Sequence, residues 1–149
     1  MKIKLLTTVL IAIGCITCSK DSYNTTPTLK FEGVNATVFP RNSVVTFKLQ
    51  CTDKEGDVVD TIWIQRVSKV VPCQLSVIYF DSLRIPDFNP PKNVKADFNF
   101  TFNYPGPPPP SLAGCSEQDD TVYFKFWMHD KAQHISDTVQ SPDIVLLKQ

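Results

Sequence analysis

The sequence predicts a single all-β domain, an antiparallel β-sandwich of about seven strands. Three observations support this fold class. The chain of 149 residues contains 10 Phe and 12 Pro, residue types that favour strands and turns over helices. Residues 98–104 and 122–128 alternate apolar and polar side chains, so each stretch has one buried and one solvated face. No stretch after residue 27 shows a sustained helical period.

Apolar runs bounded by turn residues set the positions of the individual strands. The expected strands, in chain order, are 28–31, 43–52, 60–67, 75–79, 95–104, 121–129, and 136–139 continuing to 144–147. In the second of these, Cys51 has the same phase as Phe47 and Leu49, so its side chain is expected to point into the core.

The first 18 residues have the pattern of a secretory signal peptide. Lys2 and Lys4 precede a charge-free, mostly apolar run at 5–13, which is too short to cross a bilayer as a helix. A cysteine stands where cleavage is expected, so the segment resembles a bacterial lipoprotein signal, in which the new N-terminal Cys is acylated. Cys18 is the preferred lipidation site, because the Ser-Lys-Asp after it resembles the start of lipoproteins of Bacteroidetes-type bacteria. Cys15, which follows a small glycine, is the alternative.

The expected organisation is a lipoprotein signal peptide at 1–17, a flexible tether at 18–27 and one β-sandwich domain at 28–149. About 130 residues remain after the signal, which suffices for one compact core and not for two. An acyl chain contributes about 0.8 kcal/mol per buried methylene to membrane attachment. We therefore expect a protein anchored by lipid in the bacterial cell envelope, at the outer membrane, facing the periplasm or the cell surface.

Charge argues against nucleic acid as a partner. Cleavage removes Lys2 and Lys4, which lowers the fifteen basic residues to thirteen against fifteen acidic ones, a net charge of about −2. No basic patch accompanies this balance, so the electrostatic attraction that nucleic-acid binding requires is missing.

Three cysteines follow the signal, and the oxidising envelope permits disulfides between them. Cys51 lies on a core face, whereas Cys73 follows a proline and Cys115 follows a glycine in loop-like contexts. We predict a disulfide between Cys73 and Cys115. A zinc site is disfavoured because no Cys-x-x-Cys pair or matching His spacing is present.

Two segments resemble bacterial immunoglobulin-like and fibronectin-like modules. The strand at 121–129 leads into DKAQHIS at 130–136, which is similar to the Asp-x-Ala-Gly-Asn-x-Ser turn in the final hairpin of those modules, with Gln133 and His134 in place of the Gly-Asn pair. Residues 52–57 resemble the acidic loop after their second strand. The resemblance implies an immunoglobulin-like sandwich, and a fold by itself implies no function.

Acidic residues form the best candidate for a metal site. Asp53, Glu55 and Asp57 fall in one loop beside Gly56. In a sandwich of this kind, that loop and the last hairpin turn lie at the same end, so Asp130 is expected to join them. The favoured interpretation is an ordinary solvated acidic turn, and the alternative is a Ca²⁺ site, which hard oxygen ligands of this type would suit. We expect no cofactor, with Ca²⁺ as the one alternative.

Three aromatic residues are candidates for ligand binding. Tyr123 and Trp127 lie opposite the apolar face of their strand, and Trp63 is central in another strand. An exposed platform of such rings could stack on the pyranose rings of a carbohydrate. The alternative is burial of one or more of these rings in the core.

A repeated Asp-Thr/Ser-apolar pattern offers candidate modification sites at Thr61, Ser82, Thr121 and Thr138. The pattern resembles the O-glycosylation acceptor of Bacteroidetes-type envelope proteins. The alternative is structural, since Asp favours turns and Thr favours the start of a strand.

The sequence predicts no enzyme. It lacks a Gly-x-Ser-x-Gly elbow, an activated cysteine and a pair of carboxylates placed to face each other across a cleft. The expected function is that of a lipid-anchored cell-envelope protein acting as a non-catalytic binding or assembly module. The alternative is a carbohydrate-binding or adhesive surface lipoprotein, with or without calcium. The expected partners are the membrane, through the lipid, and an unidentified envelope protein or polysaccharide.

Overall fold

The computed structural model describes residues 24–58, 60–76, 80–86 and 88–148. The predicted signal peptide, both candidate lipidation sites (Cys15 and Cys18) and the first part of the tether lie outside the described residues. Among the residues that are described, no helix combines the length and the apolar character that crossing a membrane would need.

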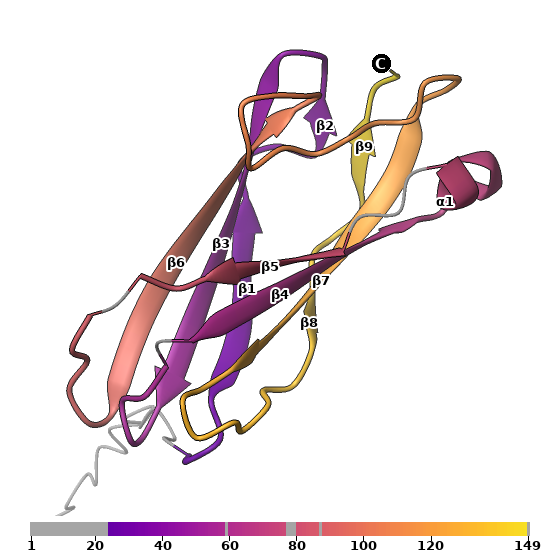
Figure 1. Ribbon diagram of the computed structural model, residues 1–149. Helices are drawn as coiled ribbons and strands as arrows, with labels where there is room; N and C mark the ends of the chain where they lie inside the picture. The colour runs from indigo at the N-terminus through magenta and orange to yellow at the C-terminus, as the bar shows by residue number, and fades with distance from the viewer. Residues whose placement is uncertain (1–23, 59, 77–79, 87, 149) are drawn as a thin grey trace, which may run out of the picture.

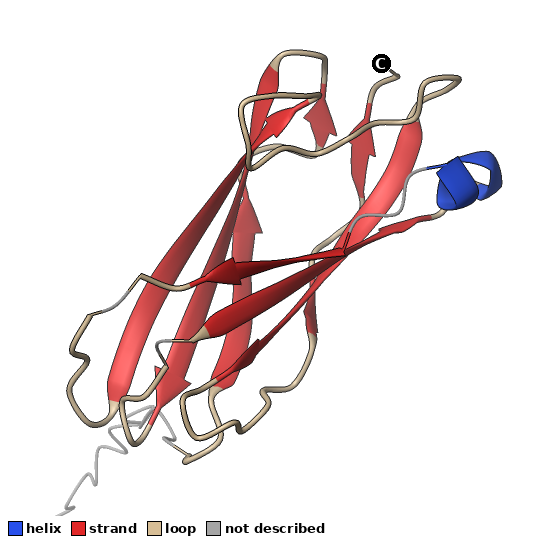
Figure 2. Ribbon diagram, in the orientation of Figure 1, coloured by secondary structure: helices blue, strands red, loops and turns tan. Residues whose placement is uncertain are grey.

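The described residues form two packed β-sheets and one short helix (Figures 1 and 2). In chain order the elements are β1 (Thr28–Val34), β2 (Val38–Phe39), β3 (Ser43–Asp53), β4 (Thr61–Ser68), α1 (Val71–Ser76), β5 (Phe80–Arg84), β6 (Val94–Tyr104), β7 (Asp120–His129), β8 (Val139–Gln140) and β9 (Ile144–Leu146). The first sheet has the order β1-β3-β6. The second has the order β2-β9-β7-β4-β5, with β8 paired to β7. This arrangement confirms the predicted all-β sandwich.

The strand order is that of an immunoglobulin-like sandwich. Strands β1, β3 and β6 correspond to A, B and E of that fold, and β4, β7 and β9 correspond to C, F and G. The strands pair antiparallel except for β2, which runs parallel to β9. The longest pairing joins all eleven residues of β3 to all eleven of β6.

Apolar side chains from the inner faces of both sheets build one core. Phe47 of β3 packs across the interface on Phe124 of β7, with ring centroids 4.8 Å apart. The buried side chains of these two strands alternate along the chain as expected: Val45, Phe47, Leu49 and Cys51 in β3, and Val122, Phe124, Phe126 and Met128 in β7. The predicted inward direction of Cys51 is confirmed, and this cysteine is free.

Several strand predictions need correction. Residues 75 and 76 of the expected strand 75–79 belong to helix α1, and residues 77–79 lie outside the described part. Pro72 explains the helix start, because proline in the first turn loses no intrahelical hydrogen bond. The edge strand β5 and the short β2 were not predicted. Of the expected strand 136–139, only residue 139 is in β8, which continues to Gln140.

The predicted disulfide between Cys73 and Cys115 is confirmed. It joins α1 to the loop between β6 and β7, with the two Cα atoms 5.5 Å apart. Both cysteines are buried. The bridge therefore ties the helix between β4 and β5 to a loop that is 42 residues away in sequence.

Candidate functional site

Two loops that are far apart in the sequence meet at one end of the sandwich (Figure 1). The loop between β3 and β4 contacts the turn after β7 through the backbone, where Lys131 N donates to Asp57 O at 3.0 Å. The end of the tether reaches the same place, since Lys54 N donates to Asn24 O at 2.9 Å. The predicted common position of the acidic loop and the last hairpin turn is therefore found.

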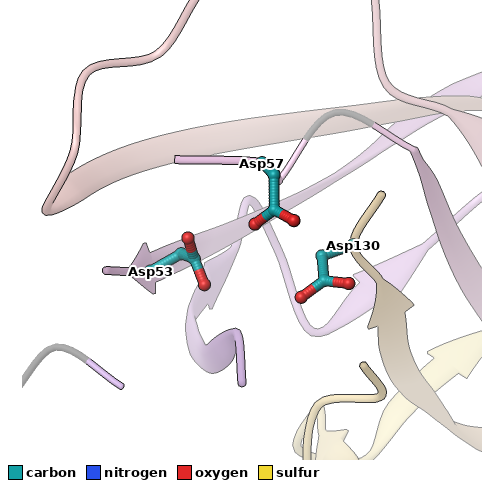
Figure 3. A group of neighbouring side chains, drawn as sticks. All are labelled: Asp53, Asp57 and Asp130. Carbon is teal, nitrogen blue, oxygen red and sulfur yellow. The ribbon is translucent and has the colours of Figure 1, made fainter. Parts of the chain in front are cut away.

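Three carboxylates from these loops converge. One oxygen from each of Asp53, Asp57 and Asp130 lies within 4.8 Å of the other two, and Figure 3 shows the three groups turned toward one another. We call these residues the acidic cluster. Asp53 and Asp130 are completely buried and Asp57 is half-buried. Glu55, the fourth residue of the predicted metal set, is exposed and lies outside the cluster.

The β3–β4 loop wraps around the carboxylate of Asp53. Its Oδ1 accepts hydrogen bonds from the backbone N–H of Glu55 at 2.8 Å and of Gly56 at 2.6 Å. Gly56 has a φ of +77°, and a Cβ there would lie 2.5 Å from the carbonyl oxygen of Pro91, so only glycine fits. Oδ2 of Asp53 is buried and has no hydrogen-bond partner.

The turn after β7 is organised around Asp130. Its Oδ1 accepts the backbone N–H of His134 at 2.8 Å, and its Oδ2 lies 2.9 Å from His134 Nδ1. This hydrogen bond and the negative charge of Asp130 raise the pKa of His134. Gln133 has a left-handed backbone with a φ of +68°, at the position where the resembling turn has glycine.

Negative charge at the acidic cluster affects nearby groups. Burial, and then the charges of Asp130 and Asp53, raise the pKa of Asp57. Burial, followed by the charges of Asp53 and Asp130, raises the pKa of the Cys51 thiol to about 12. Each shift has the direction expected when like charges disfavour ionisation of a neighbour.

The outer face of the second sheet carries a separate group of rings. Trp63 of β4 and Trp127 of β7 are directly paired across the strands, with ring centroids 6.4 Å apart and an interplanar angle of 8°. Phe80 of β5 lies 5.3 Å from the Trp63 ring and 5.8 Å from the Trp127 ring, and it is 53% exposed. We call these three residues the aromatic patch. Phe80 was not among the predicted binding residues, because β5 was not a predicted strand.

Tyr123 lies on the outer face of β7, as expected, but it is not part of the aromatic patch. It is four residues from Trp127, a distance of about 13 Å along a strand. The ammonium groups of Lys69 and Lys125 lie 5.8 and 5.9 Å from the centre of its ring. Of the three predicted ligand-binding aromatics, Trp63 and Trp127 are therefore neighbours, and Tyr123 instead lies near two lysine side chains.

The four candidate glycosylation sites are in different settings. Ser82 and Thr138 are exposed, whereas Thr61 and Thr121 are half-buried. The hydroxyl of Thr61 donates to the neighbouring Asp60 carboxylate at 3.1 Å. The two exposed hydroxyls are the more accessible of the four.

Comparisons with known proteins include a distant structural likeness. No family model matches the sequence, and no curated protein matches it. Among solved structures, the chain is similar to the sporulation control protein Spo0M from Bacillus subtilis, with 12% sequence identity and a TM-score of 0.46. The similarity covers 83% of this chain and 50% of Spo0M, so the chain spans about half the length of that protein.

Proposed function

We propose that this protein is a lipid-anchored module of a bacterial cell envelope that binds a partner without catalysing a reaction. The signal-like start ending in Cys18 supports the anchor, with Cys15 as the alternative site. The disulfide between Cys73 and Cys115 supports export, because such bonds persist in oxidising compartments. The outer membrane is the proposed location.

The aromatic patch is the observation that carries the binding function. Tryptophan and phenylalanine side chains supply large contact areas at low conformational cost and dominate the energetics of many interfaces. In this protein they gather on the outer face of a sheet, where β4 and β7 present Trp63 and Trp127 and the last strand in the sheet order, β5, presents Phe80. An envelope protein that covers these rings would remove their apolar surface from water.

A carbohydrate ligand is the second candidate function. The rings of Trp63 and Trp127 are almost parallel, at 8° to each other, and neither side chain is fully buried. Two such rings can each stack against the apolar face of a sugar. This observation favours a surface lipoprotein that binds or adheres to polysaccharide.

The experiment compares the proteins that are recovered with the wild type, with Trp127→Ala and with Tyr123→Ala. Each is purified from native membranes after mild cross-linking. The wild type should retain an envelope protein that Trp127→Ala loses. Tyr123→Ala is the matched control, since Tyr123 is on the same face of the same strand and outside the patch. Equal recovery of every partner by wild type and Trp127→Ala would contradict the proposal. Retention of the wild type and Tyr123→Ala on a polysaccharide column, with loss of Trp127→Ala, would favour the carbohydrate ligand.

The anchor is tested separately by the intact mass of the membrane-extracted protein. Cleavage before Cys18 with added acyl chains is the expected result. A chain cleaved elsewhere and carrying no lipid would contradict the anchor while leaving the aromatic patch to be tested as above. Sugar mass in addition to the lipid would support modification at sites such as Ser82 and Thr138.

A further inference from the structure

We propose that the acidic cluster, Asp53, Asp57 and Asp130, is a calcium-binding site that joins the β3–β4 loop to the turn after β7. The proposal is independent of the partner-binding function, because the cluster is at the end of the sandwich and the aromatic patch is on a sheet face. It rests on three features of the cluster: unsatisfied buried oxygens, spacing and charge.

Two carboxylate oxygens in the cluster are buried without a hydrogen-bond partner. They are Oδ2 of Asp53, whose side chain is fully buried, and Oδ1 of Asp57. Leaving such an acceptor unpaired costs about 1–3 kcal/mol, and more for a charged group. Figure 3 shows that both carboxyl groups turn toward Asp130. A cation between the three groups would satisfy the two unpaired oxygens together.

The spacing of the oxygens fits calcium. Ca²⁺ binds oxygen at about 2.3–2.6 Å, so two oxygens on the same ion are separated by at most about 4.6–5.2 Å. The three carboxylates here provide oxygens within 4.8 Å of one another. Mg²⁺ binds at about 2.0–2.1 Å, which limits two of its ligands to about 4.2 Å. Calcium can therefore bridge oxygens over the whole of the 4.8 Å limit, whereas magnesium can bridge only those closer than about 4.2 Å. Water can complete the coordination of calcium at the half-buried Asp57.

The charge of the cluster also favours a cation. Three carboxylates lie together, and the ionisable group seen to pair with them is the His134 imidazole, 2.9 Å from Asp130. A histidine carries at most one positive charge, so this imidazole offsets at most one of the three negative charges. The like charges of the three carboxylates repel one another. A divalent ion would remove that repulsion and hold the two loops together where the tether enters.

The test measures the melting temperature of the purified protein in EDTA, in 5 mM CaCl₂ and in 5 mM MgCl₂ at constant ionic strength. Extracellular calcium modules bind with Kd values of about 10⁻⁴–10⁻³ M, so calcium should raise the melting temperature by about 3–9 °C. Magnesium should raise it by less. A melting temperature that is the same in calcium and EDTA, or that rises as much in magnesium as in calcium, would overturn the proposal.

Two variants of the same loop make the test specific. Asp57→Asn should abolish the calcium response and should melt at a higher temperature than the wild type in EDTA, because it removes one of three repelling charges. This gain in EDTA separates loss of the site from loss of the fold. Glu55→Gln removes a charge that is exposed and outside the cluster, so it should keep the full calcium response. A calcium response that survives in Asp57→Asn, or disappears in Glu55→Gln, would overturn the assignment. Isothermal titration with CaCl₂ should show one site in the wild type and none in Asp57→Asn.

Discussion

Arg66 of β4 and Asp120 of β7 form a salt bridge in which both side chains are fully buried. The hydroxyl of Ser68 donates to the second oxygen of the same carboxylate. Burial lowers the pKa of Arg66 to about 10, against an opposing effect of Tyr104, so the guanidinium stays charged at neutral pH. The two central strands of the second sheet thus share a buried ion pair as well as their backbone hydrogen bonds.

Removing only one partner of this ion pair should strongly lower the free energy of unfolding. Asp120→Ala leaves the Arg66 guanidinium buried without the carboxylate, and we expect the free energy of unfolding to fall by about 3–5 kcal/mol. Urea titration measures the change. The double variant Arg66→Met with Asp120→Leu should lose much less, because it buries no charge. A loss below about 1 kcal/mol in Asp120→Ala would show that the pair contributes little.

The disulfide gives a second prediction. Reducing or replacing the bond between Cys73 and Cys115 releases a loop spanned by 42 residues, and the loop-entropy relation gives a loss of about 4 kcal/mol. We expect the double variant Cys73→Ser, Cys115→Ser to unfold at clearly lower urea concentration than the wild type. Dithiothreitol should shift the wild type to the same midpoint. A wild type insensitive to the reductant would mean that the bridge is absent or does not stabilise the fold.

The buried thiol of Cys51 gives a prediction about pH. Burial, then the charges of Asp53 and Asp130, raise its pKa to about 12, whereas the thiol of an unfolded chain has a pKa of about 8.5. Because the folded-state pKa is the higher one, this group costs no stability below pH 8. Above that pH the unfolded state loses the proton first, so stability declines as the pH rises toward 12.

Two measurements check this behaviour. Alkylation of Cys51 at pH 8, followed by peptide mass spectrometry, should be more than about a hundredfold slower in the native protein than in urea, because burial limits both the thiolate fraction and access. Urea midpoints should fall between pH 8 and 10.5 by more in the wild type than in Cys51→Ala. Rapid native alkylation, or an equal fall in both proteins, would contradict the assignment of a buried, protonated thiol.

Features with a strong local signal were predicted from the sequence. The alternation of large apolar side chains located β3, β6 and β7, and the phase of Cys51 separated the free thiol from the two bridged ones. The end of the sandwich at which Asp53 and Asp130 meet followed from the order of strands in an immunoglobulin-like fold. Local pattern was sufficient for each of these because strand phase and strand order determine the direction of a side chain.

Features that depend on tertiary contacts were not predicted. Arg66 has the same phase as Ile62 and Ile64, which predicts an inward side chain. The strand pattern does not identify its ion-pair partner, which is 54 positions away in the sequence. Phe80 was left out of the expected strand 75–79, whereas the chain forms α1 first and then β5, which begins at Phe80. Glu55 was grouped with the acidic cluster by spacing alone, and the loop turns it into solvent. Spacing along a loop does not fix which side chains converge.

The turn after β7 contains a strained residue whose replacement should stabilise the protein. Gln133 has a φ of +68°, a region that costs a residue with a Cβ about 1 kcal/mol and costs glycine almost nothing. Its side chain makes only long hydrogen bonds, 3.3 Å to Asp60 and 3.4 Å to the backbone of Asp130. We expect Gln133→Gly to raise the free energy of unfolding by about 0.5–1 kcal/mol, or the melting temperature by about 2–4 °C.

Gln133→Ala is the matched control for this variant. It removes the same hydrogen bonds and keeps the Cβ, so it should be no more stable than the wild type. The difference in stability between the glycine and alanine variants therefore measures the cost of the left-handed backbone conformation at this position. Since Gln133 N donates to Asp130 O and closes the turn, the glycine variant should keep the geometry of that turn. Equal melting temperatures for the glycine and alanine variants would show that the left-handed conformation at this position costs nothing in the folded protein.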